Sequence, residues 1–155
     1  LPVAKFLRER FGMPYVVGAP LGDTVSALLL GALQKSIHTG ENEILPAGTP
    51  DAPDTVILGE SVTARSLAAA LLLDYGLCAE VICPVELPRE LEGSFCRQIE
   101  DEQDLQAALS GARRVIADPL YRPIVPQGAQ FFPLPHEAYS GRIYRKQIPN
   151  LVTTW

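Results

Sequence analysis

The sequence has no long hydrophobic run and no excess of positive charge. Its longest apolar stretches read VSALLLGAL and LAAALLLDYGL, and both are shorter than the roughly 20 residues that a membrane-spanning helix needs. Lys and Arg number 13 against 18 Asp and Glu, which gives a formal net charge of -5. An acidic chain with scattered basic residues does not suit a nucleic-acid backbone. We therefore expect contact with neither membrane nor nucleic acid.

Cysteine is scarce and is not arranged as a ligand set. The 3 cysteines lack paired spacing, which fits a reducing compartment and makes the cytoplasm the expected location. Cys78 and Cys83 lie in one predicted strand at a spacing that points them to opposite faces. Cys96 could approach one of them from a neighbouring strand, but an iron-sulfur cluster usually needs about four thiolates. We expect buried apolar cysteines and no metal site in this chain.

The glycine patterns of nucleotide-binding loops are missing. The first predicted strand-to-helix turn reads ILGESVTARS, with a single glycine where the dinucleotide fingerprint has several, and no GxxxxGK[ST] loop occurs. Glu60 would repel a phosphate at this turn. The amides at the start of helix 61–75, one turn from Arg65, still leave an anion site open as an alternative. A hydrolase site made of Ser140, His136 and either Asp118 or Glu137 is disfavoured because no GxSxG frames the serine.

The sequence does contain the alternation that is typical of an α/β domain. With 155 residues, 47% of them hydrophobic and 20% charged, the chain can bury a real core. From residue 55 onward, apolar strands alternate with helices. The predicted strands are TVILGE, CAEVICPV, FCRQIE, RRVIAD and AQFFPL. The predicted helices are 61–75, capped by Ser61 or Thr63 and ended by Gly76, a helix capped by Asp101 and ended by Gly111, and a short PLYRPIVPQ helix. This pattern predicts a Rossmann-like three-layer sandwich with a mainly parallel five-stranded sheet.

The residues before this domain have a different pattern. Residues 1–37 show a helix ended by Gly12, a short strand and a second helix capped by Asp23 or Thr24, and we interpret them as the tail of a preceding α/β unit plus a crossover helix. Residues 38–54 hold prolines and glycines without a sustained period and are expected to form a linker, which leaves 55–155 as the Rossmann-like domain. The opening LPVAKFLRERFG has no initiator Met or signal-type leader, so we expect a fragment of a longer protein.

Ligands of open parallel sheets bind beyond the carboxyl ends of the strands, where the strand order reverses. The predicted strands end at residues 60–63, 84–87, 118–122 and 133–139. We therefore expect the turns that begin at Glu60 and His136 to meet at one rim of the sheet.

These segments together resemble a known family. FLRERFGMPYVVGAPLGDTVSAL, TVILGESVTARSLAAALLLDYGLCAEVICPVE, DLQAALSGARRVIAD and GAQFFPLPHEAYSGRIYRKQIPNLV resemble the nitrogenase component 1 type oxidoreductases. That family includes molybdenum-iron protein subunits, cofactor scaffold proteins and dark-operative protochlorophyllide reductase subunits. The most specific piece is HEAYSG with an aromatic residue shortly after it. Tyr144 stands nearest the place where the catalytic subunit has a cofactor-ligating histidine, so this sequence departs from the family there.

The resemblance implies a function and a set of site residues. It implies a domain of an oxidoreductase component that helps to enclose a metallocluster or a tetrapyrrole-type substrate and receives electrons from an ATP-dependent iron-sulfur reductase. A homologous subunit is the second implied partner. An iron-sulfur or related metallocluster is expected in the full-length protein and none in this fragment, which alone is expected to be inactive. The residues implied to face the cofactor are Glu60, Thr63, Arg65, His136, Tyr139, Ser140 and Tyr144.

Two other functions stay open from the sequence. The same sheet edge would serve a non-catalytic ligand-binding or assembly module, a reading that the missing ligands favour. A nucleotide-sugar or phosphate-binding enzyme would use the helix that begins at Ser61.

Overall fold

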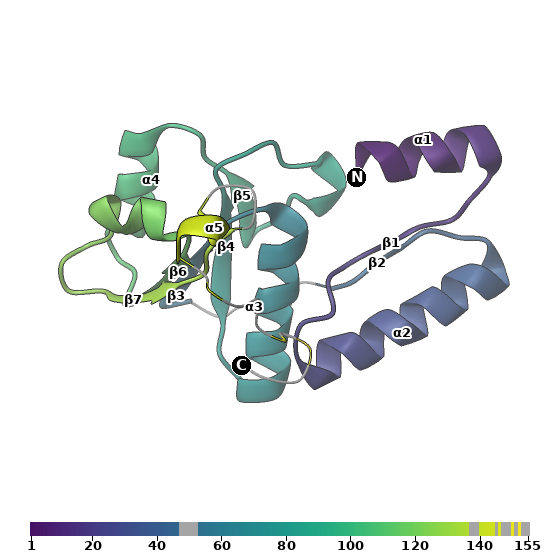
Figure 1. The fold of residues 1–155 in the computed structure, drawn as a ribbon, viewed down its shortest axis with the longest axis horizontal. Helices are drawn as coiled ribbons and strands as arrows, with labels where there is room; N and C mark the ends of the chain where they lie inside the picture. Colours follow the sequence, from purple (N-terminus) through teal and green to yellow (C-terminus); the bar gives the residue numbers. More distant parts are fainter. Residues whose placement is uncertain (47–52, 137–139, 145, 147–149, 151, 153–155) are drawn as a thin grey trace.

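A computed structural model describes residues 1–46, 53–136, 140–144, 146, 150 and 152. Figure 1 shows a layered molecule in which a sheet lies between helices on both faces, and an N-terminal unit packs beside the layer of α3. No helix among these residues has the length and apolar character needed to cross a membrane.

The central sheet confirms the predicted fold class. Its strands are β3 (Thr55–Leu58), β4 (Ala79–Cys83), β5 (Cys96–Gln98), β6 (Arg114–Ala117) and β7 (Gln130–Pro133). They are all parallel and lie in the order β5-β4-β3-β6-β7. The chain moves outward from β3 to β5 on one side and then returns to build β6 and β7 on the other. The strand order therefore reverses between β3 and β6, which is where such sheets bind ligands.

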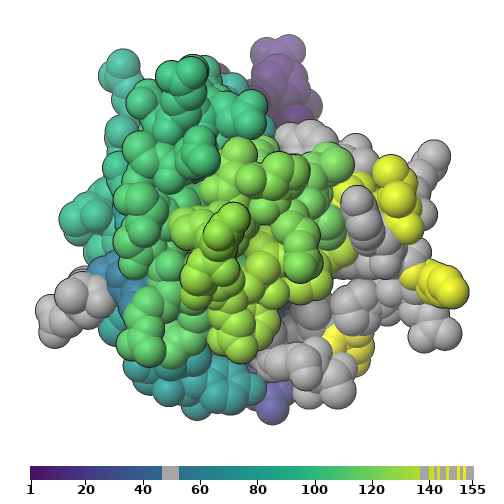
Figure 2. Space-filling view, turned by 90° about the vertical axis from the view of Figure 1, so that its left-hand side faces the viewer, coloured from purple at the N-terminus to yellow at the C-terminus, as the bar shows by residue number. Residues whose placement is uncertain are grey.

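The two faces of the sheet carry separate cores. All four residues of β3 are buried, and because side chains alternate along a strand, Ile57 packs with α3 (Ser61–Tyr75) while Val56 packs with α4 (Glu102–Leu109). Two short 3-10 helices, η1 (Arg89–Leu91) and η2 (Pro119–Ile124), connect β4 to β5 and β6 to β7. Viewed from the left of Figure 1, the segments from α4 to β7 form one continuous green surface (Figure 2).

The first 46 residues form a small α/β unit that differs in detail from the prediction. It comprises α1 (Pro2–Phe11), β1 (Val16–Val17), α2 (Gly22–Thr39) and β2 (Glu43–Ile44), and β1 pairs with β2 in parallel. The stretch 38–54, predicted as a linker, thus contains the end of α2 and a strand. Leu21, and not Asp23 or Thr24, is the N-cap of α2, without a side-chain hydrogen bond. Gly12 and Gly40 end the two helices in the left-handed conformation.

Hydrogen bonds join this unit to the sheet domain. The Ala19 amide donates to Ser66 Oγ on α3 at 2.9 Å, and Lys5 on α1 pairs with Glu90 in η1. Helix α2 also packs along α3. The N-terminal unit therefore covers the outer side of α3, and it leaves the carboxyl ends of β3 and β6 to the segments described next.

Candidate functional site

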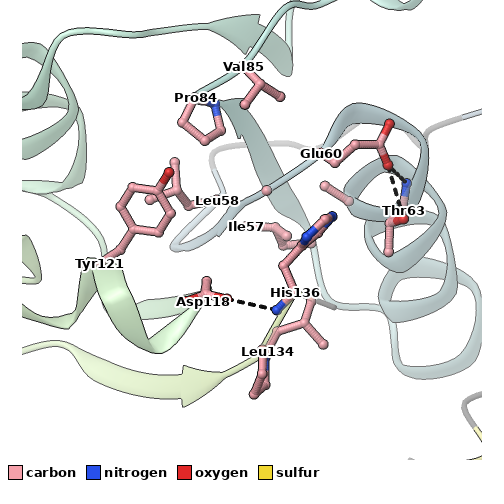
Figure 3. A pocket seen from close by; sticks show the side chains of 13 residues that line it. Ile57, Leu58, Glu60, Thr63, Pro84, Val85, Asp118, Tyr121, Leu134 and His136 are labelled. Carbon is pink, nitrogen blue, oxygen red and sulfur yellow. Dashed lines mark hydrogen bonds between the residues drawn. The ribbon is translucent and has the colours of Figure 1, made fainter. Parts of the chain in front are cut away.

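A cavity of about 240 Å³ lies at the point where the strand order reverses (Figure 3). Its walls come from the ends of β3, β4, β6 and β7, from the first turn of α3 and from η2, and most of its lining is apolar. The lining residues are Ile57, Leu58, Gly59, Glu60, Thr63, Ala64, Pro84, Val85, Asp118, Tyr121, Leu134, Pro135 and His136. Glu60 and His136 thus share one cavity, as the strand-end argument predicted.

Glu60 is bound to the start of α3. Its carboxylate accepts hydrogen bonds from the Val62 amide at 2.8 Å, the Thr63 amide at 3.0 Å, the Thr63 hydroxyl at 3.1 Å and the Ser61 hydroxyl at 3.2 Å. Burial of Glu60 favours the neutral acid, but these donors, led by the Thr63 amide, outweigh it and leave the pKa of Glu60 below its ordinary value of 4.5. The predicted caps Ser61 and Thr63 are wrong: their hydroxyls donate to Glu60, which is the N-cap.

The hydrogen bonds of Glu60 determine which ligands the start of α3 is able to bind. The first amides of a helix attract an anion, and in this chain the Glu60 carboxylate is that anion. A phosphate would have to displace it and meet its charge. The alternative of a phosphate at the helix that begins at Ser61 therefore has no support in the geometry.

Arg65 lies outside the cavity. Its guanidinium Nη1 donates to the Leu91 carbonyl at 2.8 Å and Nη2 donates to the Leu45 carbonyl at 3.5 Å. It therefore ties the β4–β5 connection and the residue after β2 to α3. Arg65 therefore cross-links segments of the chain and is not among the residues that line the cavity.

Asp118, which ends β6, organises the opposite wall. Its Oδ1 accepts from the Leu120 amide at 2.9 Å, and its Oδ2 accepts from the His136 amide at 2.7 Å and from the Ser140 hydroxyl. Burial favours the neutral acid, but the Ser140 hydroxyl, the His136 amide and the Leu120 amide outweigh it and hold the pKa of Asp118 below 3.8. The sequence placed Asp118 at a strand end and in the disfavoured hydrolase set, but not among the residues implied to face a cofactor.

The described residues of HEAYSG are bound to that carboxylate and to each other. His136 and Ser140 both donate to Asp118, and the His136 carbonyl accepts from the amides of Ser140 and Gly141 at 3.0 and 2.8 Å, just before α5 (Gly141–Tyr144). Figure 3 shows the His136 ring directed toward the Glu60–Thr63 turn, with Tyr121 across the cavity. Ser140 is fully buried against Asp118, so it positions the turn and does not face the cavity.

Two of the predicted site residues are not placed. Tyr139 lies outside the described residues, and for Tyr144 the structure describes the backbone at the end of α5 but not the side chain. Of the predicted set, the structure brings Glu60, Thr63 and His136 to the cavity. Tyr121, Pro84 and Val85 line it as well and had been considered only as strand-end or core positions.

Two of the three cysteines form a buried pair, and neither is among the described residues that line the cavity. Cys83 on β4 and Cys96 on β5 lie on the same face of adjacent strands, and both are fully buried. Their thiols interact: the Cys83 thiol, followed by the Arg65 charge, lowers the pKa of Cys96 to about 7, while Cys96 and burial raise the pKa of Cys83. Across the described residues, no group of three or more His, Cys, Asp or Glu side chains is placed to hold a metal ion.

The cavity therefore combines apolar walls with a few polar groups whose positions are fixed by hydrogen bonds. Such a site excludes water from a bound molecule and orients it through a small number of contacts. His136 supplies the one imidazole among the described lining residues. Comparisons with protein-family models, with curated proteins and with solved structures give no match to this chain.

Proposed function

We propose that this chain is a Rossmann-like domain of a nitrogenase-like oxidoreductase component. In this proposal the switch-point cavity forms part of the wall around a metallocluster or a tetrapyrrole-type substrate, which receives electrons from an ATP-dependent iron-sulfur reductase. A homologous subunit and a cytoplasmic location belong to the same proposal. The observation that carries it is the apolar cavity that joins the Glu60 turn to the HEAYSG turn, the most specific segment of the resemblance.

The described residues do not fit a cluster that this domain would ligate by itself. No cysteine lines the cavity, and His136 is its one imidazole. Cys83 and Cys96 are fully buried in the core of the α3 face. Since a cluster usually needs about four thiolates, ligands would have to come from elsewhere, and the role proposed for this domain is to surround the bound group.

Three features of the cavity would act on the bound group. The apolar walls lower the local dielectric constant, which strengthens any charge or hydrogen bond to a bound group. Asp118 accepts a hydrogen bond from the backbone amide of His136, which anchors the residue that carries the imidazole. Glu60 is held by the start of α3 and contributes a fixed negative charge to the same cavity.

The test uses the full-length protein, reconstituted anaerobically with iron and sulfide and examined by EPR. We expect a cluster signal whose spectrum or reduction potential shifts in His136→Ala. The matched control is His38→Ala, because the only other histidine of the chain lies exposed in the last turn of α2. A protein that is EPR-silent in every redox state, with iron at background and no binding of protochlorophyllide, would contradict the proposal.

One observation favours a second candidate, a non-catalytic ligand-binding or assembly module. The described lining holds carboxylates, a hydroxyl, a phenol and an imidazole, but no thiol. A module of this kind would bind a ligand in the same EPR-silent protein and would show no electron transfer from the reductase.

A further inference from the structure

A second cavity, of about 410 Å³, opens between α3 and the strands β6 and β7. Right-handed crossovers place the helices of outward and returning strand moves on opposite faces of a sheet. Here α3 contacts β4 and β3, while α4 and η2 pack against each other on the other face. Neither α4 nor η2 therefore covers the α3 face of β6 and β7, where apolar Ile116 and Phe132 line the second cavity together with Leu67 and Leu71 of α3.

The two cavities share two lining side chains. Thr63 and Leu134 line both of them. Thr63 is in the first turn of α3, and Leu134 directly follows β7. The first cavity alone is smaller than the roughly 300–1,000 Å³ typical of sites for organic ligands, whereas the two together fall within that range.

The charges are distributed unequally. The first cavity contains the carboxylates of Glu60 and Asp118, and no Lys or Arg stands among its described lining residues. The second cavity is apolar except for Thr55, Thr63 and Arg114, and Arg114 Nη1 is paired with Asp54 Oδ1 at 2.8 Å. A ligand that occupies both cavities therefore meets negative charge at one end and hydrocarbon along the rest.

We propose that the two cavities together bind an elongated, apolar organic molecule that carries an amine or another N–H donor at its Glu60 end. The apolar body would run past Thr63 and Leu134 toward Phe132. Anionic molecules such as phosphates or sulfonates are rejected, because like charges in a cavity of low dielectric repel strongly. This inference shares with the proposed function only the cavity that both use. Of the two occupants proposed there, it favours the organic molecule over the metallocluster.

The charge preference is tested with two fluorescent probes of the same frame, N-phenyl-1-naphthylamine and its sulfonate, 8-anilinonaphthalene-1-sulfonate. We expect the amine to bind the full chain about tenfold more tightly or better. The amine is also the more apolar probe, so a higher affinity alone does not prove a charge preference. The decisive quantity is the ratio of the amine affinity to the sulfonate affinity, compared between the parent chain and Glu60→Gln. This substitution removes the charge and keeps a hydrogen-bond acceptor. The ratio should fall about threefold or more. Glu102→Gln, exposed on α4 of the other face, is the control and should leave it unchanged.

The location is tested by filling the junction. Leu134→Trp should weaken binding of N-phenyl-1-naphthylamine at least about tenfold, while Leu73→Trp, exposed on α3 and lining neither cavity, should not. Should Leu134→Trp fail to fold, Phe132→Lys at a partly exposed position serves instead, and it should weaken the amine and strengthen the sulfonate.

Unchanged amine affinity in the folded junction variant, or a ratio that Glu60→Gln does not move, overturns the inference. These results are separate from the EPR test. A protein that forms a cluster but fails the probe titrations keeps the proposed function and loses this inference. A protein that passes the titrations but shows neither a cluster nor binding of protochlorophyllide keeps this inference and loses the proposed function.

Discussion

At the scale of the residue, Glu60 illustrates how one side chain serves both a helix and a cavity. Glu60→Ala removes the acceptor of two amides and two hydroxyls at the start of α3. We expect it to lower the free energy of unfolding by about 1–2 kcal/mol, the usual cost of a lost N-cap. Urea denaturation followed by circular dichroism measures this change.

The matched control is another glutamate. Glu90→Ala breaks the pair with Lys5, but both side chains are well exposed, and exposed ion pairs contribute little. Its urea midpoint should stay close to that of the parent chain. An equal decrease in the free energy of unfolding in both variants would mean that the hydrogen bonds of Glu60 stabilise the fold no more than an exposed ion pair does.

The two anchored carboxylates also set how stability depends on pH. Donors hold the folded-state pKa of Glu60 below 4.5 and that of Asp118 below 3.8. Groups with a depressed folded-state pKa stabilise the fold fully above their unfolded pKa, and this contribution disappears as the pH falls through the folded pKa. Stability should therefore be level down to about pH 5 and then fall. Urea midpoints measured from pH 7 to pH 2.5 check this, and Asp118→Asn should flatten the acid limb; an unchanged limb in that variant would contradict the assignment.

At the scale of the element, two glycines that look alike in the sequence differ in their surroundings. A Cβ on Gly18, which follows β1, would lie 2.4 Å from Leu45 Cδ1 and 2.8 Å from Leu45 Cγ. Gly31 is exposed inside α2, and a Cβ there would meet nothing within 4 Å. Gly18 is therefore needed for the close contact with Leu45, which follows β2, whereas Gly31 has room for a side chain.

This difference predicts opposite effects of the same substitution. Gly18→Ala forces Leu45 to move and should destabilise the fold by about 1–3 kcal/mol. Gly31→Ala relieves the entropy cost of a glycine inside a helix and should stabilise by about 0.5–1 kcal/mol. Thermal and urea unfolding of both variants give the two signs. If Gly18→Ala were neutral, the contact between Gly18 and Leu45 would be looser than the structure has it.

The elements that the sequence predicts are those with strong local signals. β3 is a continuous apolar run, and Gly76 ends α3 in the left-handed conformation expected of a C-cap. β2 was missed because a two-residue strand in a polar stretch is stabilised by its partner β1 and not by its own sequence. The N-cap of α3 was assigned to the short hydroxyl side chains because the usual preference favours them, whereas the longer Glu60 reaches the same amides.

The candidate site was predictable to the extent that it follows from topology. In a parallel sheet the carboxyl ends meet at one edge, and this brings Glu60 and His136 into one cavity. The direction of Arg65 and the burial of Ser140 depend on tertiary partners, the Leu91 carbonyl and the Asp118 carboxylate, which no local pattern identifies. Sequence reasoning therefore located the rim but not which of its residues face the cavity.

At the scale of the whole molecule, exposed apolar side chains gather on the N-terminal unit. No residue of α1 is buried, and Phe6 and Phe11 pack edge to face at 6.4 Å with most of their surfaces in solvent. Arg8 on α1 donates to the Gly40 carbonyl at the end of α2, which brings α1 beside the turn that Ile37 precedes. A two-stranded sheet with such helices is marginal alone, and a group of exposed apolar side chains can mark an interaction surface.

The chain should therefore associate through the N-terminal unit. We expect sedimentation equilibrium of the 155-residue chain to give an average mass above that of one chain, 16.8 kDa, rising with concentration. The double variant Phe6→Lys, Ile37→Lys places charges at positions 58% and 79% exposed, so the fold should tolerate them while burial in an interface becomes costly. Leu120→Lys, 56% exposed in η2, adds one such charge away from the N-terminal unit and should leave association intact. A parent chain that sediments as a monomer at every concentration would contradict the prediction, and a loss of association in Leu120→Lys alone would place the interaction surface elsewhere.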